Sequence, residues 1–264
     1  MTTNTLRTAL DADTRSLATR VICPWPGVIE VLGQTDAFDY VEFAAEYAPF
    51  DLHDLDHIAR TAELSGLSTM IKVDAEPRTY LAQRAMAAGI QNVLFVDIRT
   101  AEDAREAVRA VRAEPTGTNG VRKDRRNGYV GGYASPEEIV TWCDDAVVAL
   151  MIEKREAMEN LEDILAVEGV DMVQFGPVDY ALSIGNPGGR HSEEVQQAQR
   201  EMIDMALDVG VTPRAEIKMP DNADDYLDRG VSHFSLDTDV NILHRFWQEQ
   251  GTELGNRLDD VAHD

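Results

Sequence analysis

The chain has 264 residues, with 24 Lys and Arg against 48 Asp and Glu, so its formal net charge is −24. An apolar content of 44% is enough for a hydrophobic core and excludes global disorder. No apolar run reaches the roughly 18 residues of a membrane span, and the N-terminus lacks the pattern of a secretory signal. An acidic surface without a basic stripe repels phosphates, which disfavours nucleic acid as a partner.

The types of basic residue and the distribution of acids indicate adaptation to salt. Arginine supplies most of the cations, and the only lysines are Lys72, Lys123, Lys154 and Lys218. Acidic residues are spread along the whole chain, and high salt would screen their mutual repulsion. This composition is typical of halophilic, haloarchaeal proteins. The two isolated cysteines show no metal or disulfide spacing, which indicates reduced thiols and a cytoplasmic protein.

Short apolar runs alternate with longer amphipathic stretches, which is the βα pattern of a parallel sheet. Strands are predicted at residues 20–23, 38–43, 69–73, 92–96, 146–152, 172–175, 212–217 and 233–236. Helices are predicted at residues 28–32, 52–64, 80–88, 101–111, from 136 onward, and at 160–166, 193–209, 221–229 and 240–250. Eight units predict an α/β fold of one domain, a (β/α)8 TIM barrel. We expect an N-terminal arm (1–17), the barrel (18–250) and an acidic C-terminal tail (251–264).

One long segment, residues 114–135, lacks periodicity and is rich in Gly, Arg and Asn. A loop of this length inside a compact domain is usually functional or disordered. It holds the one local basic cluster, formed by Arg122, Lys123, Arg125 and Arg126. This cluster could gather an anionic substrate or form salt bridges at a subunit interface, and the sequence leaves both open.

Chemistry-bearing residues follow several of the predicted strands, where the active site of a barrel lies. They are Glu46 and Tyr47, Lys72, Glu153, Asp179 and Asp237. Glu153 and Asp179 end two neighbouring buried strands, and two carboxylates there suit Mg²⁺ or Mn²⁺ with open water positions. The alternative is that Glu153 pairs with a basic neighbour such as Arg155.

Several motifs together resemble the HpcH/HpaI aldolase/citrate lyase family. They are Met151–Leu161, Gly176-Pro177-Val178-Asp179-Tyr180, the segment from Phe38 to Pro49, and the segment from Ala88 to Ala104. The resemblance covers residues 18–250. It implies a (β/α)8 barrel whose last helix is exchanged between subunits of a homo-oligomer, a hexamer or trimer. It also implies a divalent metal cation, Mg²⁺, Mn²⁺ or Co²⁺, held by Glu153 and Asp179. That cation would bind a 2-oxo acid whose carboxylate lies near Gly176 and Pro177.

The chain departs from this family's pattern at four positions. Tyr47 stands where aldolases of the family carry a proton-transferring histidine, and Ala44 replaces the aspartate that supports it. Lys72 replaces an arginine that stabilises the enolate oxygen, and Met151 replaces a glutamine. We expect Tyr47 and Lys72 to be the catalytic pair. Tyr47 could move a proton if the lysine lowers the pKa of the phenol, since a phenol with a pKa near 10 is a poor base at neutral pH.

Other candidates have more than one interpretation. Trp25, after the first strand, could form part of the substrate pocket beside Met151, or simply pack. His53 could supply the missing base, although with His57 it fits a solvated helix face better. Lys72 as a Schiff-base lysine is redundant beside two metal-binding acids.

The leading hypothesis is a metal-dependent carbon–carbon lyase that cleaves or forms a hydroxy-2-oxo acid through a pyruvate-type enolate. One alternative is a citrate-lyase-like or malyl-CoA-type acyl-CoA lyase, in which the Arg122–Arg126 cluster would bind the CoA phosphates. The other is a repurposed barrel that binds a metal–oxo acid without turnover.

Overall fold

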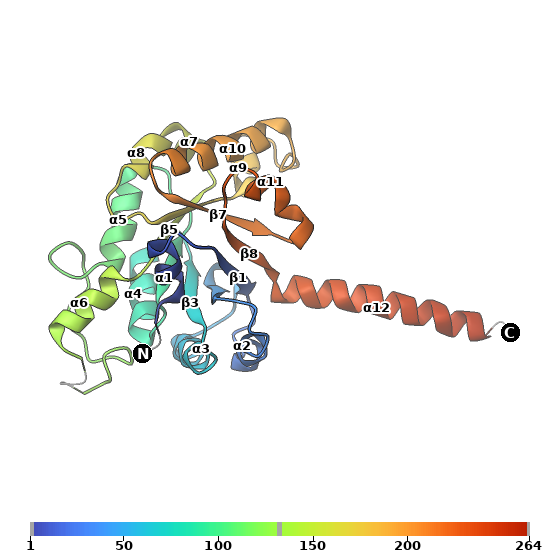
Figure 1. Cartoon of the computed structure of the whole chain (residues 1–264), viewed down its shortest axis with the longest axis horizontal. Coiled ribbons are helices and arrows are strands. Elements are labelled where there is room, and N and C mark those ends of the chain that lie inside the picture. Colours follow the sequence, from blue (N-terminus) through green and yellow to red (C-terminus); the bar gives the residue numbers. More distant parts are fainter. Residues whose placement is uncertain (1–2, 131–133, 263–264) are drawn as a thin grey trace.

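The computed structural model describes residues 3–130 and 134–262. Eight parallel strands close into a barrel in chain order, with β8 pairing back to β1 (Figure 1). The predicted TIM-type barrel is therefore confirmed. The strands are β1 (Ser16–Val21), β2 (Tyr40–Ala44), β3 (Ser68–Val73), β4 (Asn92–Phe95), β5 (Val148–Ile152), β6 (Met172–Phe175), β7 (Thr212–Ile217) and β8 (His233–Thr238).

The helices form the outer layer around the barrel, apart from α1 and α12. They are α1 (Thr5–Asp11), α2 (Pro26–Gly33), α3 (Leu52–Leu64), α4 (Arg78–Ala88), α5 (Ala101–Val111), α6 (Pro136–Asp144), α7 (Arg155–Glu159), α8 (Leu161–Leu165), α9 (Pro177–Ser183), α10 (Glu193–Asp208), α11 (Asp224–Leu227) and α12 (Asp239–Ala262). Capping boxes start α3, α5 and α6, as their Asp, Thr and Ser caps predict.

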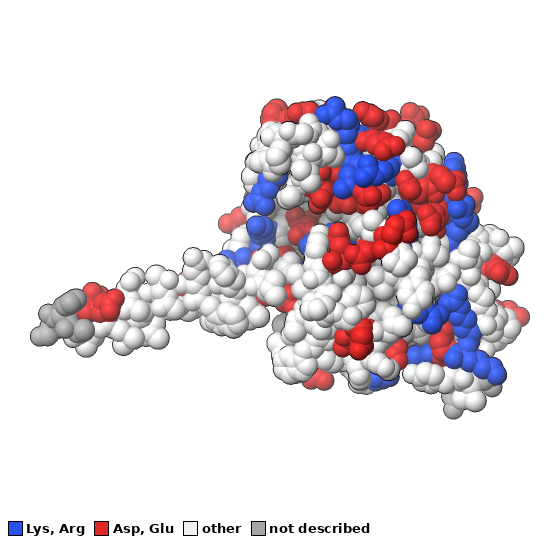
Figure 2. Space-filling view, turned by 180° about the vertical axis from the view of Figure 1, so that it is seen from behind, with Lys and Arg blue, Asp and Glu red and all other residues white. Residues whose placement is uncertain are grey.

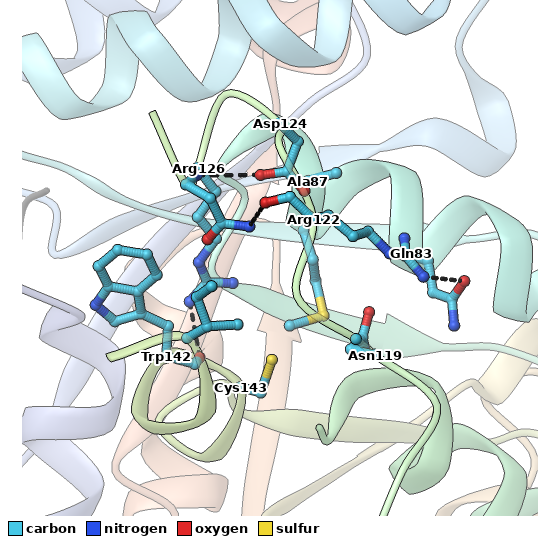
Figure 3. Close-up of a pocket in the computed structure, with 12 residues that line it drawn as sticks. Gln83, Ala87, Asn119, Arg122, Asp124, Arg126, Trp142 and Cys143 are labelled. Atoms are coloured by element: carbon cyan, nitrogen blue, oxygen red, sulfur yellow. Dashed lines mark hydrogen bonds between the residues drawn. The ribbon is translucent and has the colours of Figure 1, made fainter. Parts of the chain in front are cut away.

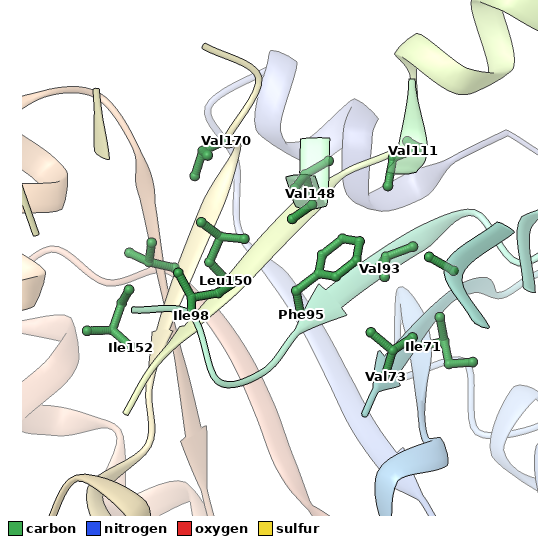
Figure 4. Close-up of a cluster of buried hydrophobic side chains, with 14 of the residues drawn as sticks. Ile71, Val73, Val93, Phe95, Ile98, Val111, Val148, Leu150, Ile152 and Val170 are labelled. Atoms are coloured by element: carbon green, nitrogen blue, oxygen red, sulfur yellow. The ribbon is translucent and has the colours of Figure 1, made fainter. Parts of the chain in front are cut away.

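The main hydrophobic core lies between the strands and the outer helices. Side chains on the outer face of β4 and β5, such as Phe95 and Leu150, are fully buried against this layer (Figure 4). Because neighbouring residues of a strand point to opposite faces, the intervening residues point into the barrel. Helices on one face and packed side chains on the other explain why these strands are almost wholly apolar.

The barrel interior is apolar at one end and polar at the other. A second cluster, which includes Leu6 of α1 and Met70, fills the end where the strands begin. Helix α1 closes this end, where Asn4 Nδ2 donates to Asn92 Oδ1 at 2.8 Å. Side chains at the opposite end, where the strands finish, are largely charged. The barrel interior therefore carries its charge toward the mouth.

Helix α12 differs most from its prediction. The expected helix ended at Gln250, before a glycine, but α12 continues through Gly251 and Gly255 to Ala262. A glycine inside a helix costs only about 1 kcal/mol, so it does not force an end. The helix projects away from the barrel (Figure 1), and much of its surface is uncharged (Figure 2). Phe246 and Trp247 are 59% and 65% exposed.

Two smaller differences concern the flanks of strands. Strand β1 begins at Ser16 rather than Arg20, because its polar first half points partly into the barrel, where Ser16 Oγ bonds His233 Nδ1 at 2.8 Å. The helix predicted over 221–229 shortens to α11 after a single 3₁₀ turn. Within the described ranges, no helix is both long enough and apolar enough to cross a membrane.

Candidate active site

A cavity of about 1030 Å³ opens at the ends of the strands. Its lining contains all but one of the predicted catalytic, metal-binding and substrate-binding residues, namely Tyr47, Lys72, Met151, Glu153, Gly176, Pro177 and Asp179. The exception is Trp25, which is 68% exposed and lies outside this lining. A contribution of Trp25 to the pocket is therefore not seen within this chain.

Glu153 directly follows β5 and is 4% exposed. Its Oε1 accepts a hydrogen bond of 2.9 Å from the backbone N–H of Asp97, a residue held at φ 54°. Burial raises the pKa of the Glu153 carboxyl, while the Asp97 N–H and the Lys72 ammonium partly oppose this shift. Burying an ionised carboxylate with so few hydrogen bonds and no ion pair costs free energy, unless a cation binds beside it.

The basic residues that follow Glu153 in the chain contact other groups. Arg155 donates to the carbonyl oxygen of Ile184 at 3.3 Å, so the pairing considered from the sequence does not form. Lys154 lies 3.3 Å from Asp97 Oδ1 and 3.9 Å from Asp179 Oδ1. Among the ion pairs formed by the described residues, none involves Glu153. Its second oxygen is thus available for a ligand.

Gly176 explains how this oxygen is placed. A Cβ atom at position 176 would lie 2.7 Å from both Cβ and Oε2 of Glu153. The φ angle of Gly176 is −107°, which any residue adopts, so the glycine is needed for space rather than for conformation. The Gly-Pro pair that starts α9 therefore lets the Glu153 carboxylate pack directly against the backbone of the next strand's loop.

Asp179 lies in the first turn of α9, and its side chain is 47% exposed. Its charge raises the pKa of Glu153, in addition to the larger effect of burial, which places the two carboxylates in mutual range. No group of three or more His, Cys, Asp or Glu side chains in the described parts of the chain is arranged to hold a metal. Two protein carboxylates with water in the remaining positions are, however, a usual arrangement for Mg²⁺.

Lys72, Tyr47 and Glu46 form a connected group on the other side of the cavity. The Lys72 ammonium donates to the Tyr47 hydroxyl at 2.7 Å and lies 2.7 Å from Glu46 Oε2. It also lies 4.6 Å from the centroid of the Tyr47 ring. Lys72 ends β3 and is 4% exposed, whereas Tyr47 is 49% exposed. A rigid cation therefore holds an accessible phenol at the mouth of the barrel.

The pKa directions define the protonation of this group. Burial raises the pKa of the Tyr47 phenol and outweighs the opposing effect of Lys72. Burial lowers the pKa of Lys72, but Tyr47 and Glu46 outweigh it and hold that pKa above its usual value. The condition under which Tyr47 would act as a base, a lowered phenol pKa, is thus not met, because desolvation exceeds the attraction of the ammonium. At neutral pH Tyr47 is a proton donor and Lys72 is a cation unsuited to Schiff-base formation.

Sequence reasoning missed a set of charged residues inside the barrel. Together with the amide of Gln174 (β6), they lie at the inner face of four strands: Arg20 (β1), Glu42 (β2), and Arg214 and Glu216 (β7). All except the fully buried Glu42 line the same cavity. The signal was present, because one charged or amide residue interrupts each of β1, β2 and β6, and two charged residues lie two positions apart in β7. Their pairing depends on closure of the barrel and so could not be read locally.

Three other sequence candidates lie outside the cavity. His53 and His57 are exposed on α3, which fits a solvated helix face. Asp237 is 2% exposed and accepts from Arg245 of α12 at 2.7 Å, so it anchors that helix.

Three arginines of the basic cluster in the long loop contact neighbouring helices of the same chain (Figure 3). Arg122 donates to Gln83, and Arg125 pairs with Glu63 at 2.6 Å. Arg126 is 9% exposed, donates to the carbonyl oxygen of Trp142 and lies over the Trp142 ring. These three arginines attach the loop to α3, α4 and α6, which leaves them little freedom to bind the phosphates of a CoA.

A family model described as HpcH/HpaI aldolase/citrate lyase matches residues 29–244. The chain belongs to this family. The resemblance seen in the motifs is thus confirmed, and with it the assignment as a carbon–carbon lyase of the aldolase type.

Members of the HpcH/HpaI family with known names match along most of the barrel. A 2-dehydro-3,6-dideoxy-6-sulfogluconate aldolase of Pseudomonas putida is 30% identical over 217 residues, covering 81% of this chain and 82% of the relative. A 4-hydroxy-2-oxo-heptane-1,7-dioate aldolase of Shigella flexneri is 33% identical over 179 residues, covering 66% and 65%. The crystal structure of a family protein from Burkholderia cenocepacia superposes with a TM-score of 0.87 at 26% identity, covering 96% and 99% of the two chains.

Proposed function

We propose that this lyase cleaves and forms a hydroxy-2-oxo acid, with a 2-oxo acid of the pyruvate type and an aldehyde as the other reactants. Glu153 and Asp179 would hold a divalent cation, Mg²⁺ or Mn²⁺ and also Co²⁺. The observation that carries the proposal is the buried Glu153 carboxylate, which has one backbone donor, lies against Gly176 and shares the mouth with Asp179. Such a cation supplies Lewis-acid stabilisation of negative charge on the keto oxygen of the substrate.

Lys72 and Tyr47 carry the proton-transfer half of the site. In cleavage, the bond between C3 and C4 of the substrate breaks, C4 becomes the aldehyde carbon, and the electron pair remains on the 2-oxo acid as an enolate. The Lys72 ammonium stabilises the enolate oxygen as a fixed, buried positive charge. The Tyr47 phenol, protonated at neutral pH, then delivers its proton to C3 and is reprotonated from water, while the proton of the substrate's 4-hydroxyl leaves to water in the cavity as the C3–C4 bond breaks.

The wall of the substrate pocket is formed by Met151 and the Gly176-Pro177 pair. The Gly176 N–H already donates to the carbonyl oxygen of Ile152 at 3.0 Å, and Pro177 has no N–H. Their contribution to binding a 2-oxo acid is therefore one of shape. Replacement of the family's glutamine by Met151 removes a polar group from this wall and leaves an adaptable apolar surface.

The proposal is tested by measuring metal affinity and turnover in the same variant. In Glu153→Gln, we expect Mn²⁺ affinity to fall at least tenfold and cleavage of every accepted hydroxy-2-oxo acid to be lost. Exhaustive chelation should abolish the activity of the unchanged protein, and Mg²⁺ or Mn²⁺ should restore it. Glu159→Gln, the same change on an exposed face of α7, is the control. Full turnover of the chelated protein would refute the proposal.

The two alternatives from the sequence remain distinguishable in the same assay. An acyl-CoA lyase would cleave a malyl-type thioester and not the free acid, and the structural use of Arg125 and Arg126 weighs against it. A repurposed barrel would bind pyruvate or oxalate with Mg²⁺ and turn over none of the acids.

Three further properties belong to the same proposal. The enzyme works in the cytoplasm of a halophile, which fits its charge of −24. It forms a homo-oligomer, a hexamer or trimer, in which α12 packs on a neighbouring barrel. Its partner is a small 2-oxo acid rather than a nucleic acid or a membrane.

A further inference from the structure

The charged residues that line the inner strands form a closed ring of side-chain contacts, which we call the polar ring. Its members are Arg20, Glu42, Arg214, Gln174 and Glu216. Arg20 Nε lies 3.2 Å from Glu42 Oε1, and Glu42 also pairs with Arg214. Arg214 donates to Gln174, Gln174 Nε2 donates to Glu216 Oε2 at 3.5 Å, and Glu216 pairs with Arg20.

The ring occupies the side of the cavity that extends from β6 through β7 to β1 and β2. Strand β5, which Glu153 directly follows, is four strands from β1 in the barrel order and therefore faces it. Both Arg20 and Glu216 line the same cavity as Glu153 and Lys72. A substrate whose 2-oxo acid end lies at Glu153 therefore extends its far end toward Arg20 and Glu216.

The cost of this ring argues for a role in recognition. Glu42 and Arg214 have fully buried side chains, and that of Arg20 is 9% exposed. Burial raises the pKa of Glu42, but Arg214 and Arg20 outweigh it and hold that pKa below its usual value, so the ring stays ionised. Apolar residues of the same volume would commonly give equal or greater stability. The inner pair fixes the outer pair, Arg20 and Glu216, whose polar atoms meet the cavity.

The ring is balanced in charge, with two guanidinium groups and two carboxylates. A distal carboxylate or phosphate would therefore find no uncompensated cation here and would face the Glu216 carboxylate. An aliphatic tail would remove water from the 35% exposed Glu216 side chain without replacing its hydrogen bonds. A hydroxyl group both donates and accepts, so neighbouring hydroxyls can donate to Glu216 and accept from Arg20.

From this arrangement we propose that the polar ring is the subsite for the aldehyde portion of the substrate and selects a neutral, hydroxylated aldehyde. The inference rests on the proposed aldolase function and names the class of its second substrate. Arg20 and Glu216 are the specificity-determining residues, and Glu42, Arg214 and Gln174 are positioning residues. Lys218 and Arg190, exposed where they line the cavity, are the cations that an anionic tail would reach instead.

The experiment measures aldol addition of pyruvate, with Mg²⁺ and in high salt, to three aldehydes. Glyceraldehyde is the neutral hydroxylated probe, succinic semialdehyde the anionic one and propionaldehyde the apolar one. We expect kcat/KM for glyceraldehyde to exceed the other two at least tenfold, because a site built around paired polar groups rejects a partner that leaves them unpaired. Equal values for all three, or preference for succinic semialdehyde, would overturn the inference.

Two variants test the residues themselves. Glu216→Leu should lower kcat/KM for glyceraldehyde by ten- to a hundredfold and leave propionaldehyde unchanged or improved. Glu216→Gln keeps the shape but removes one negative charge beside Arg20, and should raise the relative rate with succinic semialdehyde. Glu162→Gln, the same change on the exposed surface of α8, should leave the ranking of the aldehydes unaltered. The same ranking in all three variants and the unchanged protein would refute the assignment of Glu216.

Formation of the enolate from pyruvate is measured separately, without aldehyde. NMR follows the exchange of the pyruvate methyl protons for deuterium. Exchange in Glu216→Leu at the rate of the unchanged protein shows that the variant is folded and its metal half works. If exchange is present and the aldehydes are not discriminated, the polar ring is not the subsite and the aldolase function stands. If neither exchange nor cleavage occurs in the unchanged protein, the proposed function fails and this inference fails with it.

Discussion

The Lys72 ammonium lies 2.7 Å from the Tyr47 hydroxyl, and Glu46 holds the same ammonium from the other side at 2.7 Å. The lysine is buried and the phenol is half exposed, so the fixed partner positions the accessible one. In the proposed function, this phenol of raised pKa takes the place of the histidine expected from the family resemblance. The consequence is that the site should depend on Tyr47 for turnover more than for binding.

Tyr47→Phe removes the hydroxyl and keeps the ring over Lys72. We expect kcat for cleavage to fall about 100-fold, the lower end of general acid–base contributions, with little change in KM. The measurement is steady-state kinetics with a hydroxy-2-oxo acid in high salt. Tyr80→Phe, the same change at an exposed position of α4, serves as the control. An unchanged kcat in Tyr47→Phe would exclude the phenol from proton transfer.

Gly176→Ala tests the close approach of Glu153 to the backbone. The added Cβ would meet Glu153 Cβ and Oε2 at 2.7 Å, so the carboxylate must move although the backbone angle suits alanine. We expect metal affinity to fall about tenfold or more, as when a ligand loses its supporting contacts. Calorimetric titration with Mn²⁺ measures it. Gly188→Ala, where a Cβ meets open space, should bind the metal normally; equal affinities in the two variants would contradict this account.

Much of the site was accessible from the sequence because strand ends are local features. Glu153, Asp179, Lys72 and Tyr47 each follow an apolar run, and a parallel barrel brings all such ends to one mouth. The barrel itself follows from eight alternating units, since each apolar run is too short for a helix. The observed start of β1 differs from the predicted one, because the polar first half of this strand, from Ser16, faces the barrel interior.

The features that the sequence did not predict depend on the register of the strands and on closure of the barrel. The polar ring needs β1 paired with both β2 and β8, so that Arg20 meets Glu42 and Glu216 from strands far apart in the chain. Likewise, Asp97 donates its N–H to Glu153 from a left-handed backbone conformation after β4 that no local pattern indicated. The direction in which α12 leaves the barrel is also invisible in its amphipathic pattern. The sequence predicts which charged side chains the strands carry, and closure of the barrel determines which of these side chains are in contact.

His233 should make the fold sensitive to acid. Burial, with a smaller effect of Arg214, lowers the pKa of His233 to about 4, whereas an unfolded histidine titrates near 6.5. Between these values the unfolded chain binds the proton and the folded chain does not, so stability falls as the pH drops from 6.5 toward 4. The group's contribution is complete above pH 6.5 and amounts to about 3 kcal/mol.

In His233→Gln this titration is absent. Urea unfolding at pH 7, 5.5 and 4.5 should show the free energy of unfolding of the unchanged protein falling by about 2 kcal/mol more than that of the variant. Carboxylates titrate in both proteins, so the difference between them isolates the imidazole. Parallel pH profiles would mean that His233 binds its proton equally well in the folded and the unfolded chain, in conflict with its burial beside Ser16 and Arg214.

The surface charge should make folding depend on salt. The net charge is −24, and in Figure 2 acidic side chains gather around the upper part of the barrel, interspersed with basic ones. Screening by salt removes part of their repulsion. We expect Tm to rise by at least about 5 °C between 0.1 and 2 M KCl, corresponding to more than about 1 kcal/mol. Sucrose of equal osmolality controls for solvent exclusion, and a Tm that does not respond to KCl would refute the halophilic assignment.

Helix α12 should control the oligomeric state. It is 24 residues long, leaves the barrel, and exposes Phe246 and Trp247. An apolar face of this size is stable in water only when another surface covers it. A second copy of the chain offers that cover, since each projecting helix and each barrel recur in every subunit.

In Phe246→Asp/Trp247→Asp, each lost aromatic contact costs about 3 kcal/mol or more, so the subunit Kd should rise more than a hundredfold. Light scattering after gel filtration should then give a monomer of 29.3 kDa, against a trimer or hexamer for the unchanged protein. Gln248→Asp/Gln250→Asp adds the same charge at polar positions of the helix and should still assemble. A monomeric unchanged protein would remove α12 as the assembly element, because its apolar face would then be exposed in the working enzyme.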